Sequence, residues 1–119
     1  MIKILVIEDC PVYRLVLKVL FNSYPFEVHY STNAEEAWHL PGHTSFDLVL
    51  SDYNLPGMSG YELLCHLREN KLAPVLILMT ANRKVENECP RLQCIVDHLM
   101  YKPFLKKTLD SIISKYLRS

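Results

Sequence analysis

Short apolar runs in this chain end in residues that could carry phosphoryl chemistry. Glu8 and Asp9 follow the run at residues 2–7, Asp52 follows 46–51, Thr80 follows 74–79, and Lys102 follows 98–101. Three carboxylates brought together repel one another unless a cation neutralises them. Oxygen ligands of this kind suit Mg²⁺, which keeps several waters, and a lysine and a hydroxyl beside it would donate to a phosphoryl group. These residues therefore predict a site that moves phosphate onto a carboxylate.

The elements that must position these residues follow from apolar periodicity. We expect strands at residues 2–7, 27–31, 46–51, 74–79 and 98–101. Helical spacing appears after Pro11, which suits a first turn, and again over residues 105–116. Asn33 with Glu36 and Ser59 with Glu62 have the spacing of capping boxes that open two further helices. We expect Pro41-Gly42 to end the earlier of these two helices.

The alternation of strands and helices predicts an α/β fold. Strands joined by helical crossovers form a parallel sheet with helices on both faces, and such sheets bind ligands at the carboxyl ends of their strands. The 119 residues, half of them apolar, suffice for one domain with its own core, and no linker or repeat divides them. We therefore expect a single domain over residues 1–119.

Charge and hydropathy exclude several classes of protein. The formal net charge is zero and the pI is about 6.9, which argues against direct binding of nucleic acid or a membrane surface. The longest uncharged stretch, residues 72–82, is too short to span a bilayer. Residues 4–7 are too short for the apolar core of a signal peptide. We expect a cytoplasmic protein.

The sequence offers little support for sites other than the acidic one. Cys89 and Cys94 with His98 could be drawn as a zinc site, but the tight ligand pairs and the fourth ligand of such sites are missing. The first turn has no glycine, so a dinucleotide site or a P-loop is disfavoured. A dehalogenase-like phosphatase would need Asp-x-Asp after the first strand, and residue 11 is proline.

Taken in order, these motifs resemble the receiver domain of two-component response regulators. The resemblance covers nearly the whole chain and rests on Glu8-Asp9, on the segment 52–60 (Asp-Tyr-Asn-Leu-Pro-Gly-Met-Ser-Gly), on Thr80-Ala81 and on Lys102-Pro103-Phe104. It implies the flavodoxin-like (βα)5 three-layer sandwich with strand order 2-1-3-4-5.

The resemblance also implies roles for individual residues. Asp52 would accept the phosphoryl group of a phosphohistidine on a sensor histidine kinase or a phosphotransfer protein. Mg²⁺ would be bound by Asp9, Asp52 and the backbone carbonyl of Asn54, with Glu8 acting through water. Thr80, Lys102 and the backbone N–H of Ala81 would bind the phosphoryl oxygens, and the Lys102-Pro103 bond would be cis. The chain would then be a signalling switch that takes part in its own phosphorylation and dephosphorylation, not an enzyme with a separate substrate.

Three features depart from the family pattern. Leu99 stands where an aromatic residue often acts with Thr80 as a switch, and Tyr101 shares its face of the strand, closer to the site. Pro90 falls inside the expected fourth helix, within residues 83–96, so that helix must be late and short or partly irregular. Ile95-Val96 replaces the usual small pair before the fifth strand. We therefore expect phosphorylation to be retained and the output geometry to be altered.

The resemblance implies an output surface formed by the fourth helix, the fifth strand and the last helix. An output partner or a second copy of the chain would bind there. Strand one begins directly after Met1, which suits a receiver at the start of a longer regulator or one that stands alone. The alternatives are a pseudo-receiver that binds partners without phosphorylation and a Mg²⁺-dependent phosphohydrolase of small molecules.

Overall fold

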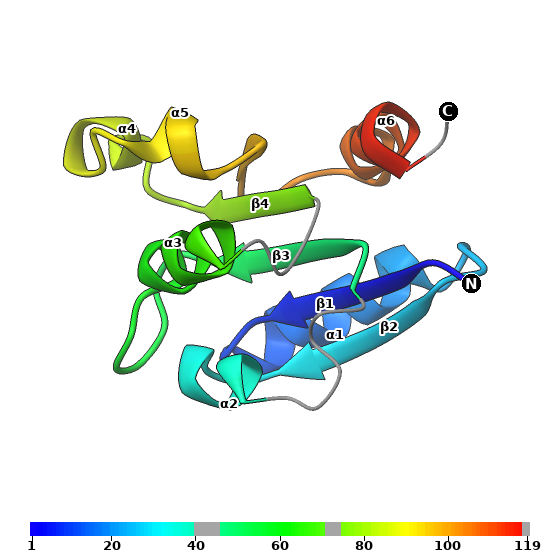
Figure 1. Cartoon of the computed structure of the whole chain (residues 1–119). Helices are drawn as coiled ribbons and strands as arrows, with labels where there is room; N and C mark the ends of the chain where they lie inside the picture. Colours follow the sequence, from blue (N-terminus) through cyan, green and yellow to red (C-terminus); the bar gives the residue numbers. More distant parts are fainter. Residues whose placement is uncertain (40–45, 71–74, 118–119) are drawn as a thin grey trace.

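A computed structural model describes residues 1–39, 46–70 and 75–117 of the chain. Five parallel strands form one sheet in the order β2-β1-β3-β4-β5 (Figure 1). The strands are β1 (Lys3–Ile7), β2 (Glu27–Ser31), β3 (Leu48–Asp52), β4 (Val75–Thr80) and β5 (His98–Tyr101). The helices are α1 (Pro11–Phe21), α2 (Ala34–Trp38), α3 (Gly60–Glu69), α4 (Val85–Glu88), α5 (Leu92–Ile95) and α6 (Lys106–Leu117). The predicted flavodoxin-like order 2-1-3-4-5 is confirmed.

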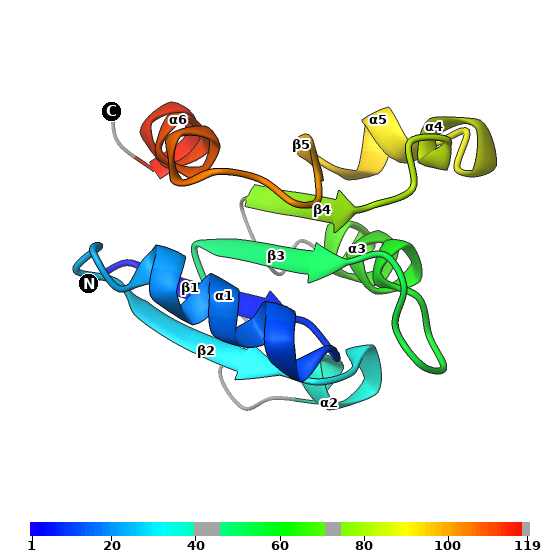
Figure 2. The same cartoon turned by 180° about the vertical axis from the view of Figure 1, so that it is seen from behind.

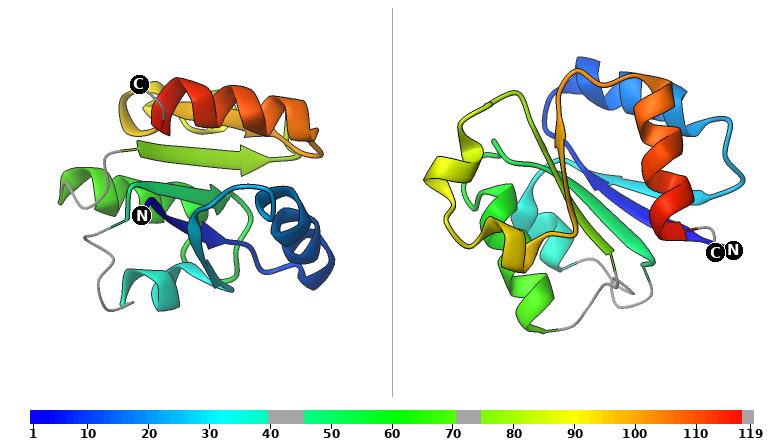
Figure 3. Two further views of the ribbon diagram at one scale, coloured as in Figure 1. Left: turned by 90° about the vertical axis from the view of Figure 1, so that its right-hand side faces the viewer. Right: turned by 90° about the horizontal axis from the view of Figure 1, so that it is seen from above.

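Helices cover both faces of the sheet and bury a core on each. Helices α2, α3, α4 and α5 lie on one face, and α1 and α6 lie on the other (Figures 2 and 3). Side chains alternate along β1, so Leu5 and Ile7 join the first core while Ile4 and Val6 join the second. Strands β1, β3 and β4 are buried on both sides, which explains why they read as continuous apolar runs.

The predicted strands are in place with shifts of one or two residues at their ends. Phe46 is buried but precedes β3, and Asp52 is the last residue of that strand. Helix α2 ends at Trp38, earlier than predicted, and Pro41-Gly42 lies outside the described residues. None of the described helices is long and apolar enough to cross a membrane.

The two predicted capping boxes differ in outcome. Ser59 and Glu62 form the complete box, in which Ser59 Oγ accepts from the Glu62 N–H and the Glu62 carboxylate accepts from the Ser59 N–H. Asn33 caps α2 by accepting from the Glu36 N–H at 2.7 Å, but Glu36 Oε1 accepts from the Ser31 hydroxyl instead. The second box is therefore only half formed, because Ser31 at the end of β2 lies within reach of Glu36.

The predicted fourth helix is interrupted, as Pro90 requires. Helix α4 ends at Glu88, Cys89 has the non-helical backbone angles φ −125° and ψ 81°, and α5 begins at Leu92. Proline lacks an N–H group and its ring clashes with the preceding turn, so a continuous helix through residue 90 is unfavourable. Val85, Cys89, Leu92 and Ile95 nevertheless bury their side chains against the sheet. The segment keeps its apolar face and loses its helical continuity.

Candidate functional site

The three predicted carboxylates meet at the carboxyl edge of the sheet. Glu8 and Asp9 follow β1 and Asp52 ends the adjacent β3, and their ligand oxygens lie within 4.8 Å of one another. Glu8 and Asp52 are buried, whereas Asp9 is exposed. The Glu8 Oε2 atom accepts from the Cys10 N–H at 3.1 Å, which fixes its carboxylate across the turn. The cluster therefore has one open side, next to Asp9.

Lys102 enters this cluster from the end of β5. Its Nζ lies 2.8 Å from Glu8 Oε1 and 3.4 Å from Asp52 Oδ1. Burial works to lower the pKa of Lys102, but the hydrogen bond to Glu8 and the two negative charges outweigh it, and the pKa is raised. Lys102 is therefore charged and forms ion pairs with two carboxylates, one directly after β1 and one at the end of β3. The Lys102-Pro103 bond is cis, as predicted.

Asp52 has an environment unusual for a carboxylate. Burial and the negative charge of Glu8 raise its pKa from 3.8 to about 6, although Lys102 acts in the opposite direction. A cation placed between these carboxylates would favour the charged form of Asp52. The site is thus electrostatically incomplete with Lys102 alone.

Thr80 ends β4, the strand next to Asp52. Its side chain is fully buried and its Oγ1 accepts from the Asn82 N–H at 3.0 Å. A hydroxyl held in this way still has its hydrogen free to donate. Ala81 follows directly and is exposed, so its position fits the predicted backbone donor at the edge of the site.

The loop after Asp52 contains Asn54, the predicted source of a carbonyl ligand. Gly57 in this loop has a φ of +72°, a region that favours glycine. A Cβ atom on Gly60 would lie 1.9 Å from the carbonyl oxygen of Asp52, so only glycine permits this close approach of α3 to the end of β3. The Gly60 N–H also donates to the Tyr53 carbonyl at 3.0 Å. Both glycines therefore shape the loop that places Asn54.

The residues present fit Mg²⁺. Glu8, Asp9 and Asp52 supply hard oxygen ligands whose negative charges exceed the single positive charge of Lys102. Cys89, Cys94 and His98 form no such group within the part of the chain that the structure describes. Cys89 is buried and Cys94 is exposed, and both are free thiols. The zinc alternative therefore has no support in the geometry.

Two residues that hold the site were not found from the sequence. Arg14 Nη1 donates to the Glu8 carbonyl at 2.9 Å and fixes the turn that bears both acids. Glu35 of α2 accepts at its Oε1 from the Met58 N–H at 3.1 Å and so holds the loop after Asp52. Both contacts link side chains to main-chain groups across loops, and no periodicity or motif signals them.

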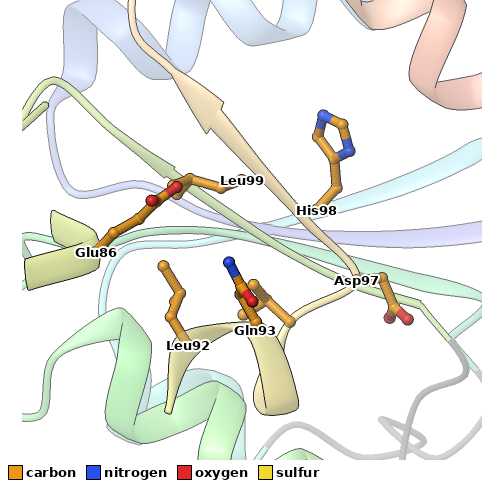
Figure 4. A pocket seen from close by; sticks show the side chains of 7 residues that line it. Glu86, Leu92, Gln93, Asp97, His98 and Leu99 are labelled. Atoms are coloured by element: carbon orange, nitrogen blue, oxygen red, sulfur yellow. The ribbon is translucent and has the colours of Figure 1, made fainter. Parts of the chain in front are cut away.

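The region of the predicted departures forms a pocket of about 240 Å³ between α5 and β5 (Figure 4). Leu92 and Gln93 of α5 and Leu99 of β5 line it, together with Glu86, Val96, Asp97 and His98. Leu99 and Tyr101 pack on the same core, as predicted, and Tyr101 is paired in register with Thr80. The guanidinium of Arg83 lies 4.4 Å from the centre of the Tyr101 ring. Tyr101 thus touches the segment that follows Thr80.

Comparison with known proteins agrees with this fold and site. The family model of the response regulator receiver domain matches residues 4–114. The chain is 32% identical over 116 residues to the regulatory protein AtoC of Escherichia coli, covering 98% of this chain and 25% of that protein. Across the curated relatives that it matches, the chain spans between a tenth and about half of their length.

Solved structures give the same result. The response regulator TrrA of Thermotoga maritima, in complex with Mg²⁺ and BeF, is 30% identical with a TM-score of 0.86, and the match covers 98% of this chain and 100% of that one. A receiver domain of a Pseudomonas aeruginosa sensor histidine kinase, with magnesium in its active-site cleft, is 28% identical with a TM-score of 0.85 and 98% coverage of both chains. The fold and the comparisons define a signalling switch of two-component systems. The chain belongs to the response regulator receiver domain family.

Proposed function

We propose that Asp52 accepts a phosphoryl group from a phosphohistidine on a sensor histidine kinase or phosphotransfer protein. The observation that supports this most directly is the position of its carboxylate. It is buried at the end of a central strand, with the Lys102 ammonium 3.4 Å away and the oxygens of Glu8 and Asp9 close by. Receiver homologues with magnesium at this site support the same proposal.

In this reaction an Asp52 oxygen forms a bond to phosphorus as the phosphorus–nitrogen bond of the donor breaks. The electron pair of that bond stays on the imidazole nitrogen, which takes up a proton. Asp9, Asp52 and the Asn54 carbonyl would hold Mg²⁺, with Glu8 acting through water. When bound, the ion would neutralise the negative charge of the transferred group. Lys102, the Thr80 hydroxyl and the Ala81 N–H would bind phosphoryl oxygens, so catalysis rests on positioning and charge.

The phosphorylated chain would act as a switch for an output surface, not as an enzyme on a separate substrate. A phosphate on Asp52 adds negative charge and gives the Thr80 hydroxyl a new acceptor. Asn82 and Arg83 follow Thr80 and lead into α4, and Arg83 contacts Tyr101 of β5, so movement of this segment would reach α4 and β5. An output partner or a second copy of the chain would bind the surface formed by the predicted fourth helix, β5 and α6.

The phosphodonor protein would rest on α1 beside the acidic site. Helix α1 begins two residues after Asp9, and its large apolar side chains Val12, Leu15, Val16 and Val19 are exposed. Leu15, Val16 and Val19 line an apolar hollow of about 290 Å³ with Leu20. A histidine side chain is short, so its protein must contact surfaces next to Asp52. The exposed apolar residues of α1 begin at Val12, three residues along the chain from Asp9, which is the exposed member of the cluster.

We propose that residues 1–119 form one receiver domain and that it works in the cytoplasm. The family match covers nearly the whole chain, and both cores are shared among elements from its two ends. All four cysteines are free, which suits a reducing compartment.

The proposal is tested by intact mass after incubation with acetyl phosphate and Mg²⁺. We expect one added phosphate on the wild-type chain, and none on Asp52→Asn or in the presence of EDTA. A folded wild-type chain that takes up no phosphate would favour the pseudo-receiver alternative. Turnover of a generic phosphate ester without a stable adduct would favour the phosphohydrolase alternative.

A further inference from the structure

The ring of Tyr13 lies directly beside the charged group of Lys102. The Nζ atom is 4.4 Å from the ring centre, within the range of a cation–π contact. Tyr13 belongs to α1, and its ring meets Phe104 edge-on, with 6.2 Å between the ring centres and an angle of 81° between the planes. Phe104 follows the Lys102-Pro103 bond. The ring is therefore held by two segments that both border the site.

Of the described residues that contact the Lys102 ammonium, Glu8 and Asp52 offer carboxylate oxygens, whereas Tyr13 offers the face of its ring. Glu8 and Asp52 accept from or pair with the ammonium at 2.8 and 3.4 Å. The Tyr13 face attracts the positive charge through the ring quadrupole and does not offer the N–H groups a charged oxygen acceptor. A third carboxylate at this position would compete with a phosphoryl oxygen for the same donors.

The hydroxyl of Tyr13 does not explain why a tyrosine stands here. It is buried and forms no hydrogen bond with another side chain within the residues that the structure describes, and its polar neighbour there is the backbone of Phe104. Burial also raises the pKa of Tyr13, so the residue meets Lys102 as a neutral phenol and not as a counter-ion. What Tyr13 presents to Lys102 is thus its aromatic face.

We infer that Tyr13 is a positioning residue for Lys102, holding the ammonium beside Asp52 while leaving its N–H groups free for a phosphoryl group. The inference deepens the proposed function and rests on it. When a cation or a phosphoryl group enters the site, Lys102 must exchange its bond to Glu8 for a new one. The ring keeps the ammonium within reach of Asp52 during this exchange.

The test compares variants that keep the ring with variants that remove it. The readouts are the initial rate of phosphorylation by acetyl phosphate with saturating Mg²⁺ and the affinity for beryllofluoride, a phosphoryl mimic, followed by NMR. We expect Tyr13→Leu to lower both by roughly tenfold, the size of a partly desolvated cation–π contact. Tyr13→Phe keeps the ring and should stay within about twofold of wild type.

A double-mutant cycle separates positioning from a general loss of packing. If Tyr13 acts through Lys102, Tyr13→Leu should have no further effect on beryllofluoride affinity in a Lys102→Met background. Tyr24→Leu is the matched control, because Lys106 lies over the Tyr24 ring at the same 4.4 Å distance and neither residue belongs to the site. The Tyr24→Leu substitution should leave both the phosphorylation rate and the beryllofluoride affinity unchanged. Circular dichroism melts check folding, and Tyr13→Met serves as the second ring-free variant.

Three results would overturn the inference. They are a wild-type rate in both ring-free variants, an equal loss in Tyr13→Phe, or an undiminished loss in the Lys102→Met background. In each case the wild-type chain still takes phosphate on Asp52, so the proposed function stands. Absence of phosphate on the wild-type chain would instead refute the proposed function itself.

Discussion

The ammonium nitrogen of Lys102 lies 2.8 Å from Oε1 of Glu8, a carboxylate that is completely buried. The two residues are 94 positions apart in the chain and end strands that are not neighbours in the sheet. A buried carboxylate without a partner is strongly unfavourable, so Lys102 stabilises the acidic cluster as well as serving the proposed phosphate site. The same side chain thus joins the stability of the fold to its proposed chemistry.

Removing the charge of Lys102 should destabilise the protein in the absence of metal. Lys102→Met leaves Glu8 buried and unpaired, and we expect the free energy of unfolding to fall by about 3 kcal/mol in EDTA. Mg²⁺ should restore part of this loss. Urea titrations with and without Mg²⁺ measure it, and Lys106→Met is the control, because its pair with Asp110 is solvent-exposed and its loss should change little. Equal effects of the two substitutions would contradict the buried role of Lys102.

Asp52→Asn should stabilise the metal-free protein in a pH-dependent manner. Burial and the charge of Glu8 raise the Asp52 pKa from 3.8 to about 6, so the folded state binds a proton that the unfolded state releases between these values. The free energy of unfolding of the wild-type protein therefore falls as the pH rises from about 4 to about 6, because Asp52 must ionise in its buried position. We expect the Asp52→Asn substitution to add about 1–3 kcal/mol above pH 6 and nothing below pH 4. Thermal melts in EDTA across this range test the sign, and a constant difference at all pH values would contradict it.

Mg²⁺ should shift the titration of Asp52. Without metal, NMR of a carboxyl-labelled sample should give an Asp52 midpoint near 6, set by burial and Glu8. A cation bound among Glu8, Asp9 and Asp52 favours the charged carboxylate, so added Mg²⁺ should move the midpoint to lower pH, and EDTA should reverse the shift. An Asp9→Asn variant should weaken the response to Mg²⁺. A midpoint that ignores Mg²⁺ would show that the ion does not bind at this cluster.

Gly60→Ala should be more damaging than Gly57→Ala. A Cβ on Gly60 would lie 1.9 Å from the carbonyl oxygen of Asp52. Because this oxygen belongs to the backbone, the backbone of Asp52 or that of Gly60 would have to move. A Cβ on Gly57 would meet the flexible end of the Glu35 side chain at 2.6 Å, which can move away. The main cost of this substitution is the backbone strain of an alanine at a φ of +72°. We expect losses of about 3 and about 1 kcal/mol in urea unfolding. A larger loss at Gly57 would mean that α3 can retreat from Asp52 without strain.

A charge on the apolar patch of α1 should slow a protein phosphodonor and not a small one. Leu15 is 62% exposed, so Leu15→Glu should fold normally and leave phosphorylation by acetyl phosphate unchanged. The rate of phosphoryl transfer from the histidine kinase or phosphotransfer protein that phosphorylates this chain should fall by roughly tenfold, which is the effect expected when a residue at the centre of an interface is changed. Gln93→Glu on the opposite helix layer is the control and should affect neither donor. Equal slowing with both donors would place the effect at Asp52 and not at docking.

Much of the fold and site could be predicted from the sequence because both depend on local patterns. Apolar runs indicated where the strands lie, and a parallel topology brings the carboxyl ends of the strands to one edge of the sheet. The polar residues at those ends were therefore expected to converge: Glu8, Asp9, Asp52, Thr80 and Lys102. The break at Pro90 was also local, because proline disrupts a helix wherever it stands in the interior. Helix α2 stops at Trp38, before the predicted end at Pro41-Gly42, which lies outside the described residues.

Other features depended on the tertiary structure alone. Tyr13 belongs to the apolar period of α1 and reads as an ordinary core residue, yet its ring meets Lys102. Glu35 reads as part of the polar face of a short helix, yet it holds the loop after Asp52. Which atoms such side chains reach depends on how far each helix is rotated and how each loop returns to the sheet. That geometry is set by packing among all the elements, so local spacing determines the chemistry available at the strand ends, and only the assembled fold decides which side chains hold it in place.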